Sequence, residues 1–273
     1  MPTTLGSFKL QAAIGAYGQP LDFVNTLGNA GIYVAETVQR YQWGQRLITV
    51  DGRVFKYSHS LGTLLSGFGA ANIAPYNIGA VLPAAAAVGD LEVLVTIATT
   101  DGYAADGVLA KDELIGAYFI AGNGESLVQN RLILGNTAVA TGGGTTTVKL
   151  DGPIANAMTI SSSYCEIILN PYRYLSKGVY EYNAFMCVPA VNSASGYNFW
   201  GQTMGPAWVV PGGVDATPGN TVNDRSMYFV GDGSVNAGTS LTLETGYQYA
   251  GFIIEQTSSA LSAAPLLMLQ ISC

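Results

Sequence analysis

Residues 47–57 read LITVDGRVFKY and decide the fold class of this chain. Two runs rich in β-branched and aromatic residues flank Asp51-Gly52, a dipeptide that strongly favours a tight hairpin turn. The stretch therefore predicts two antiparallel strands, at 47–50 and 53–57, joined by a two-residue turn.

Short strand-like runs of the same kind continue along the chain at roughly ten-residue spacing, each ended by Gly, Asn, Ser or Pro. Helical periodicity is weak, and its best candidates are residues 23–28, 60–68 and 84–88. The sequence thus predicts an all-β fold: β-sandwich, jelly-roll-like or barrel modules with little helix. The further strands are predicted at 93–99, 126–134, 145–150, 165–169, 180–188, 228–230, 241–243, 247–254 and 266–271.

The domain organisation is expected to start with an extended N-terminal arm at residues 1–40, where glycine and proline are frequent and periodic features are few. An irregular terminal segment is the alternative. We place a first β domain at 41–160 and a second at 161–273, although composition does not shift sharply at either boundary. A single composite domain is the alternative to this division.

Charged residues make up only 11% of the chain, whereas hydrophobic residues make up 49%. The charged share is less than half of the roughly 25% that is usual in soluble domains. Such a surface favours permanent burial against protein partners, and a neutral extracellular domain is the alternative. The net charge of -7, with 11 scattered Lys and Arg, argues against a nucleic-acid partner.

No part of the sequence predicts a membrane partner. A spanning helix needs roughly 20 predominantly apolar residues, and the richest run, 80–88, is short and interrupted by Pro83. The N-terminus has neither the basic start nor the apolar stretch of a secretory signal. We therefore expect synthesis in a cytoplasm.

The sequence shows no convincing set of catalytic or metal-ligating residues, so we expect no enzymatic activity and no cofactor. Three cysteines and a single histidine, His59, offer no zinc-ligand spacing. Cys165 and Cys187 lie in apolar runs and are predicted to be core residues. His59, without a Gly-x-Ser-x-Gly motif, is predicted to be a surface or subunit-contact residue. Asp112-Glu113 reads as a charged loop rather than as a catalytic carboxylate pair.

Two motifs carry a family resemblance. Residues 44–57 (GQRLITVDGRVFKY) resemble a pattern found in structural proteins of tailed phages, and residues 197–206 (YNFWGQTMGP) resemble the aromatic-Trp-x-Gln-x-x-Gly segment of phage capsid-decoration proteins. The chain departs from that pattern at Gly201, where a larger residue is expected beside the tryptophan. The similarity spans about residue 39 to the C-terminus.

The resemblance implies a capsid decoration or cement protein on the exterior of a phage virion, made in the host cytoplasm. Its implied partners are the major capsid protein and further copies of itself, as a homotrimer. Because arginine and aromatic residues anchor many interfaces, we expect the contacts to come from the arm, the hairpin and the segment around 200–208. The candidates are Phe8, Tyr17, Arg46, Arg53, Tyr57, Trp200, Gln202 and Trp208. A solvated turn residue is the alternative for Arg53, and a core tryptophan is the alternative for Trp200.

Two other functions stay open. A receptor- or glycan-binding module of a phage tail fibre would use exposed aromatic rings to stack on sugars, and the sequence is rich in tyrosine between residues 172 and 200. A secreted β-sandwich hydrolase would need facing carboxylates in a cleft, and the missing signal segment argues against it.

Overall fold

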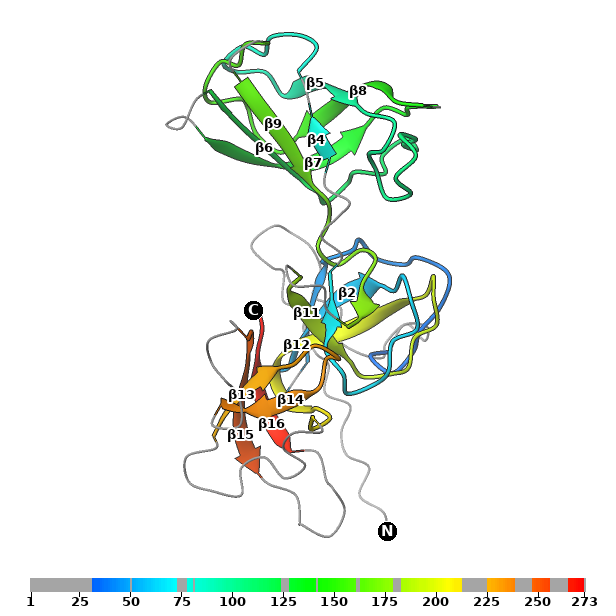
Figure 1. Cartoon of the computed structure of the whole chain (residues 1–273), viewed down its shortest axis with the longest axis vertical. Helices are drawn as coiled ribbons and strands as arrows, with labels where there is room; N and C mark the ends of the chain where they lie inside the picture. The colour runs from blue at the N-terminus through cyan, green and yellow to red at the C-terminus, as the bar shows by residue number, and fades with distance from the viewer. Residues whose placement is uncertain are drawn as a thin grey trace, which may run out of the picture.

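The computed structural model of the chain describes residues 31–49, 51–72, 78–80, 82–123, 128–140, 142–160, 163–178, 183–212, 225–238, 247–255 and 265–272. Strands account for 48% of the structure and helix for 1%, and the antiparallel sheets curve into a half-barrel and a nearly closed barrel. The predicted all-β class is therefore confirmed. Figure 1 shows the two sheets as separate bodies joined by a narrow junction.

The first body is a six-stranded antiparallel sheet in the order β4-β9-β6-β7-β8-β5. The strands β6, β7 and β8 pair with their neighbours in sequence, whereas β9 returns to the other edge of β6. The bounds are β4 (Ile78–Ala80), β5 (Glu92–Ile97), β6 (Tyr118–Asn123), β7 (Gln129–Asn136), β8 (Gly144–Leu150) and β9 (Ser163–Ile168).

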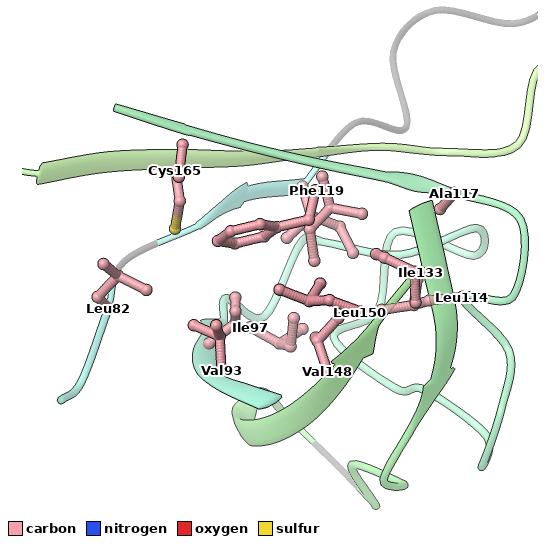
Figure 2. Packing of buried hydrophobic residues seen from close by; sticks show 14 of the residues in the cluster. Leu82, Val93, Ile97, Leu114, Ala117, Phe119, Ile133, Val148, Leu150 and Cys165 are labelled. Atoms are coloured by element: carbon pink, nitrogen blue, oxygen red, sulfur yellow. The ribbon is translucent and has the colours of Figure 1, made fainter. Parts of the chain in front are cut away.

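The core of this sheet is mostly aliphatic. In β5 exposure alternates, with Val93, Val95 and Ile97 buried and Leu94 exposed, because successive side chains of a strand point to opposite faces. Figure 2 shows Val93 and Ile97 packing toward Phe119 of the facing strand β6.

The second body is a ten-stranded antiparallel sheet whose main path runs β10-β3-β11-β12-β16-β15-β13-β14, with β1 and β2 joined to β12 through β2. A parallel bridge between Pro211 and Val235 links the end of β12 back toward β14. The bounds are β1 (Arg46–Ile48), β2 (Val54–His59), β3 (Ala70–Ala71), β10 (Ser176–Lys177), β11 (Phe185–Pro189), β12 (Asn198–Trp208), β13 (Ser226–Phe229), β14 (Val235–Ala237), β15 (Tyr249–Glu255) and β16 (Leu266–Gln270).

The ten-stranded sheet encloses several apolar clusters. One, inside the barrel of β12 to β16, includes Phe229 stacked on Phe185 with ring centroids 4.6 Å apart. Another joins the N-terminal hairpin to β12, where Tyr57 and Trp200 meet edge to face at 5.1 Å. Gly201 lies beside Cys187, and a Cβ there would collide with the Cys187 sulfur. The close approach explains why this position carries glycine where the resemblance expected a larger residue.

The local predictions can be compared with these strands. The hairpin forms, but its loop is longer than two residues: Thr49 donates to the Arg53 carbonyl, and Gly52 adopts a φ of +83° between them. This is the three-residue loop with glycine in the left-handed conformation. The helix candidates at 60–68 and 84–88 are wrong, because both segments form turns and isolated bridges. The candidate at 23–28 and the strand expected at 241–243 lie outside the described residues.

Strand pairing groups the chain differently from the expected division into 41–160 and 161–273. The hairpin of β1 and β2 pairs with β12, and β3 pairs with β11, so segments on both sides of residues 78–168 build one sheet. The reason is the matching of buried faces, because Phe55 and Tyr57 meet Trp200 and not the strands that follow them in sequence. The arm expected at 1–40 is described only from residue 31, where Ile32 is buried and Glu36 bridges to Asn198.

Candidate functional site: an aromatic junction and an apolar barrel face

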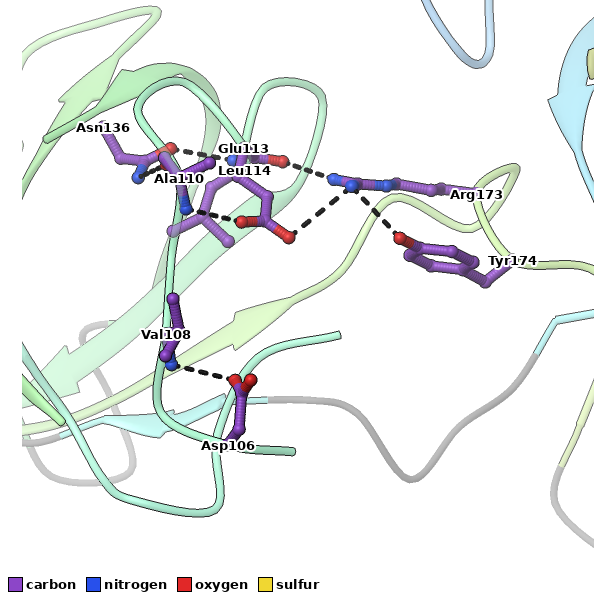
Figure 3. Close-up of polar contacts among 8 residues, drawn as sticks. All are labelled: Asp106, Val108, Ala110, Glu113, Leu114, Asn136, Arg173 and Tyr174. Atoms are coloured by element: carbon purple, nitrogen blue, oxygen red, sulfur yellow. Dashed lines mark hydrogen bonds and ion pairs between the residues drawn. The ribbon is translucent and has the colours of Figure 1, made fainter. Parts of the chain in front are cut away.

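A cluster of rings around Arg173 occupies the junction of the two sheets. Arg173 comes just after β9, and its side chain is only 11% exposed. One guanidinium nitrogen, Nη1, donates to the Glu113 carbonyl oxygen at 2.7 Å, and Nη2 lies 3.5 Å from the Glu113 carboxylate. Figure 3 shows Arg173 reaching toward Glu113, which the loop before β6 supplies.

Aromatic rings surround the same guanidinium. Its central carbon lies 3.8 Å from the ring centroid of Tyr103, 4.4 Å from Trp43 and 4.9 Å from Tyr174. A partly desolvated cation over aromatic faces is stabilised by up to about 2 kcal/mol. Burial raises the pKa of Tyr103 to about 12, although nearby Arg173 opposes the shift. The cluster stabilises the contact between the two sheets.

His59 belongs to this cluster. Its ring lies 5.0 Å from Tyr174 and 5.7 Å from Trp43, both edge to face. Burial, and then the charge of Arg173, lower the pKa of His59 below its ordinary value. His59, expected to be a surface or subunit-contact residue, is half-buried at the junction, because the turn after β9 folds over the end of β2.

Hydrogen bonds at the junction also hold Trp43 in place. The Trp43 indole N–H donates to Asn198 at 2.8 Å, and the Asn170 amide donates to the Trp43 carbonyl at 3.0 Å. Gly116 permits the second contact, since a Cβ there would collide with the Asn170 amide.

A pocket of about 630 Å³ opens beside the cluster. The segment before β1 supplies one wall, and the turn at 110–115 supplies the other. The lining residues are Gln39, Arg40, Tyr41, Gln42, Trp43, Ala110, Asp112, Glu113, Ile115 and Arg173.

A second feature lies on the outside of the barrel, across β12, β16 and β15. Pro206, Met268 and Phe252 face one another on the three strands. Exposed large apolar side chains lie on both sides of this row, and Glu255 is the one charged residue in the three strands. We call this surface the barrel face, and its exposed large apolar residues are Met204, Trp208, Tyr249, Phe252 and Ile254.

The predicted interface residues are not gathered in one place. Tyr57 and Trp200 are core residues, 1% and 2% exposed, so they are not available to a partner. Gln202 is also buried, and its amide donates to the Pro206 carbonyl at 2.8 Å. Trp208, in contrast, is 54% exposed and lies on the barrel face.

The hairpin arginines differ from each other in exposure. Arg46 is exposed on β1, whereas Arg53 is partly buried and donates to the Asp51 carboxylate at 2.8 Å. The two arm candidates, Phe8 and Tyr17, lie outside the described residues.

Both predicted core cysteines are confirmed: Cys165 and Cys187 are buried. Burial raises the pKa of the Cys187 thiol to about 12, which leaves it protonated and unreactive at neutral pH. Asp112-Glu113 forms a turn, as expected. In the described part of the chain, no group of three His, Cys, Asp or Glu side chains could hold a metal ion, and no helix could span a membrane.

Sequence reasoning missed the junction residues Arg173, Trp43, Tyr103 and Glu113. The available signal was Arg173 itself, one of few arginines, set between two tyrosines in the run 170–174 (NPYRY). Apart from the adjacent Tyr174, its partners Glu113, Tyr103 and Trp43 lie 60 or more residues away in sequence, so no local pattern connects them. Comparisons with protein-family models, curated proteins and solved structures found no match to this chain.

Proposed function

We propose that this protein is a non-enzymatic structural component of a phage virion, which decorates and stabilises the outside of the capsid. The observation that carries the proposal is the barrel face, an exposed apolar surface with a single charged residue in its three strands. Large exposed apolar patches mark interaction sites in soluble proteins. The family resemblance of residues 44–57 and 197–206 supplies the expected partner, the major capsid protein.

The chemistry of this surface fits a lasting contact between proteins. Trp208 offers a large ring that is 54% exposed, and Phe252 is 39% exposed on the neighbouring part of the face. Burying such side chains is favourable by roughly 25 cal/mol per Å² of apolar area. A homotrimer would present three such faces to a repeating lattice, so weak individual contacts would add up through high effective concentration.

The test is co-sedimentation of the purified protein with capsids that lack it, together with its mass in solution. We expect a trimer that pellets with the capsids. Phe252→Glu places a charge on the barrel face, and we expect it to weaken capsid binding by at least about tenfold. Its matched control is Leu94→Glu, at an apolar residue 41% exposed on β5 of the other sheet. A protein that never pellets with capsids, or equal losses in both variants, would contradict the proposal.

A second candidate function is a receptor- or glycan-binding module of a tail fibre. Exposed Trp208 favours it, because an indole ring can stack on a sugar as well as on a protein. Binding to host cells, lost in Trp208→Ala and accompanied by no affinity for capsids, would support this candidate over decoration.

A further inference from the structure

The geometry points to a saccharide-binding site in the pocket at the junction, a function distinct from capsid decoration. Its volume of about 630 Å³ falls within the range of roughly 300–1,000 Å³ that is usual for small-molecule sites. Both sheets contribute walls, and ligand sites favour such boundaries between structural units.

The charges of the pocket lining favour a neutral ligand over an anionic or a cationic one. Each charge of the lining already has a partner of opposite sign: Arg173 pairs with Glu113, Arg40 with Glu36, and Asp112 lies near Lys111. An anionic ligand would meet the two carboxylates, and a cationic ligand would meet the two guanidinium groups. A neutral ligand can hydrogen-bond to the exposed parts of Asp112 and Arg40 without breaking these ion pairs, and charged donors and acceptors bond more strongly than neutral ones.

The pocket also retains unused hydrogen-bonding capacity. Gln42 makes no side-chain hydrogen bond to any described residue, and it offers both a donor and an acceptor. The Asp112 side chain is 46% exposed, and among the described residues it forms an ion pair with Lys111 alone, at 4.0 Å. Hydroxyl groups suit this mixture, because each can donate to Asp112 and accept from Gln42 or Arg40.

The aromatic side chains of the pocket lining also suit a saccharide. Trp43 and Tyr41 line the pocket, and the parts of these rings that Arg173, Tyr57 and Trp200 leave uncovered can lie against the C–H groups of a sugar. Hydrogen bonds already hold these groups in place. Asn198 binds the Trp43 indole, Asn170 binds the Trp43 backbone carbonyl, and Glu113 binds the Arg173 guanidinium. Pre-organised groups lose less entropy on binding.

The experiment measures binding of neutral saccharides to the whole protein by saturation-transfer NMR and calorimetry. The probes are glucose, galactose, mannose, N-acetylglucosamine and the trisaccharides maltotriose, cellotriose and chitotriose. We expect at least one to bind with a Kd of about 1 mM or tighter. Glucuronic acid, the anionic analogue of glucose, should bind less tightly than glucose.

Two variants locate the site. Gln42→Ala and Asp112→Asn alter exposed side chains, so folding should be preserved, and each should weaken binding about five- to tenfold. The matched control is Asn130→Ala, which removes an exposed amide on β7 away from the pocket. Binding to capsids should be unchanged in all three variants, which separates this inference from the decoration proposal.

Two results would overturn the inference. In the first, none of the neutral saccharides binds at about 10 mM. In the second, a saccharide binds equally well to the wild type, Gln42→Ala and Asp112→Asn, which would place its site elsewhere, with the barrel face and Trp208 the next surface to test.

Discussion

The six-stranded sheet and the ten-stranded sheet are built from the chain in different ways. The first comes from one segment, residues 78–168, and β6, β7 and β8 pair with their neighbours in sequence. The second combines segments from both sides of that insertion, and its pairing of β2 with β12 joins residues about 140 positions apart, such as Tyr57 and Trp200. Pairing between strands close in sequence loses little chain entropy, because the loop that it closes is short. Pairing between distant strands closes a long loop and therefore loses more chain entropy.

The two cores differ accordingly. The six-stranded sheet buries mainly aliphatic side chains around one phenylalanine, Phe119. The ten-stranded sheet buries Tyr57, Trp200 and several phenylalanines, and with them polar groups such as Ser60, which hydrogen-bonds to the Tyr197 carbonyl at 3.0 Å. Large rings and satisfied polar groups specify which distant strands meet. The comparison indicates that β6, β7 and β8 are specified locally, whereas β4, β5 and β9 of the same sheet, like β2 and β12 of the other, depend on contacts between distant segments.

The largest expected effect comes from removing the central ring of each core. Trp200→Ala and Phe119→Ala should each lower the free energy of unfolding by about 3–5 kcal/mol. Hydrogen exchange should show lost protection in β2 and β12 for the first variant, and in β6 and β9 for the second. If both variants lower protection equally in both sheets, the two bodies unfold as one unit and the comparison fails.

A smaller effect is expected at a strand glycine of the barrel. Gly251 has a φ of +146°, and a Cβ there would collide with the Met268 carbonyl oxygen. Gly251→Ala should therefore cost about 2–3 kcal/mol in thermal or denaturant unfolding. The control is Gly79→Ala in β4, where a Cβ meets nothing within 4 Å. A stable Gly251→Ala variant would show that β15 and β16 can separate without loss.

The junction should respond more weakly. Arg173→Lys keeps the charge but removes the planar group that contacts three rings and the Glu113 carbonyl, so we expect a loss of about 1–2 kcal/mol. Arg131→Lys, which removes exposed bonds to Pro153, is the matched control and should cost less. Equal melting temperatures for the two variants would mean that the junction contributes no more than a surface contact.

The smallest expected effect is a pH dependence at His59. Its pKa is lowered in the folded protein, so the unfolded chain takes up a proton first as the pH falls below the ordinary value of 6.5. Above that pH, His59 therefore leaves the free energy of unfolding unchanged. Below it, preferential protonation of the unfolded chain lowers the free energy of unfolding progressively. Melting temperatures measured across this range should fall more steeply for the wild type than for His59→Gln. The chain has no other histidine. If the two curves are parallel, protonation of His59 does not cause the loss of stability.

Many strand segments could be predicted because they depend on local features, although the longest strand, β12, was not among them. Alternating burial places Val93, Val95 and Ile97 inward, and Asp51-Gly52 lies in the turn of the first hairpin, as the residue pattern predicts. The same local view misassigned residues 60–68, whose apolar spacing resembles a helix but whose backbone bonds go to distant partners such as Ser193 and Leu175. It also made Tyr57 an interface candidate and left Trp200 open between interface and core, because a short sequence segment does not show whether a side chain is exposed.

The sequence by itself determined the all-β class, most strand positions, the buried cysteines and the low charge of the surface. These follow from side-chain polarity, β-propensity and turn chemistry, each of which acts over a few residues. Only the tertiary structure decided that residues 78–168 form a separate sheet, that Arg173 meets Trp43, Tyr103 and Glu113, and that Trp208 remains exposed while Trp200 is buried. Those outcomes depend on which distant surfaces bury one another, and that choice is made by the packing of the whole chain.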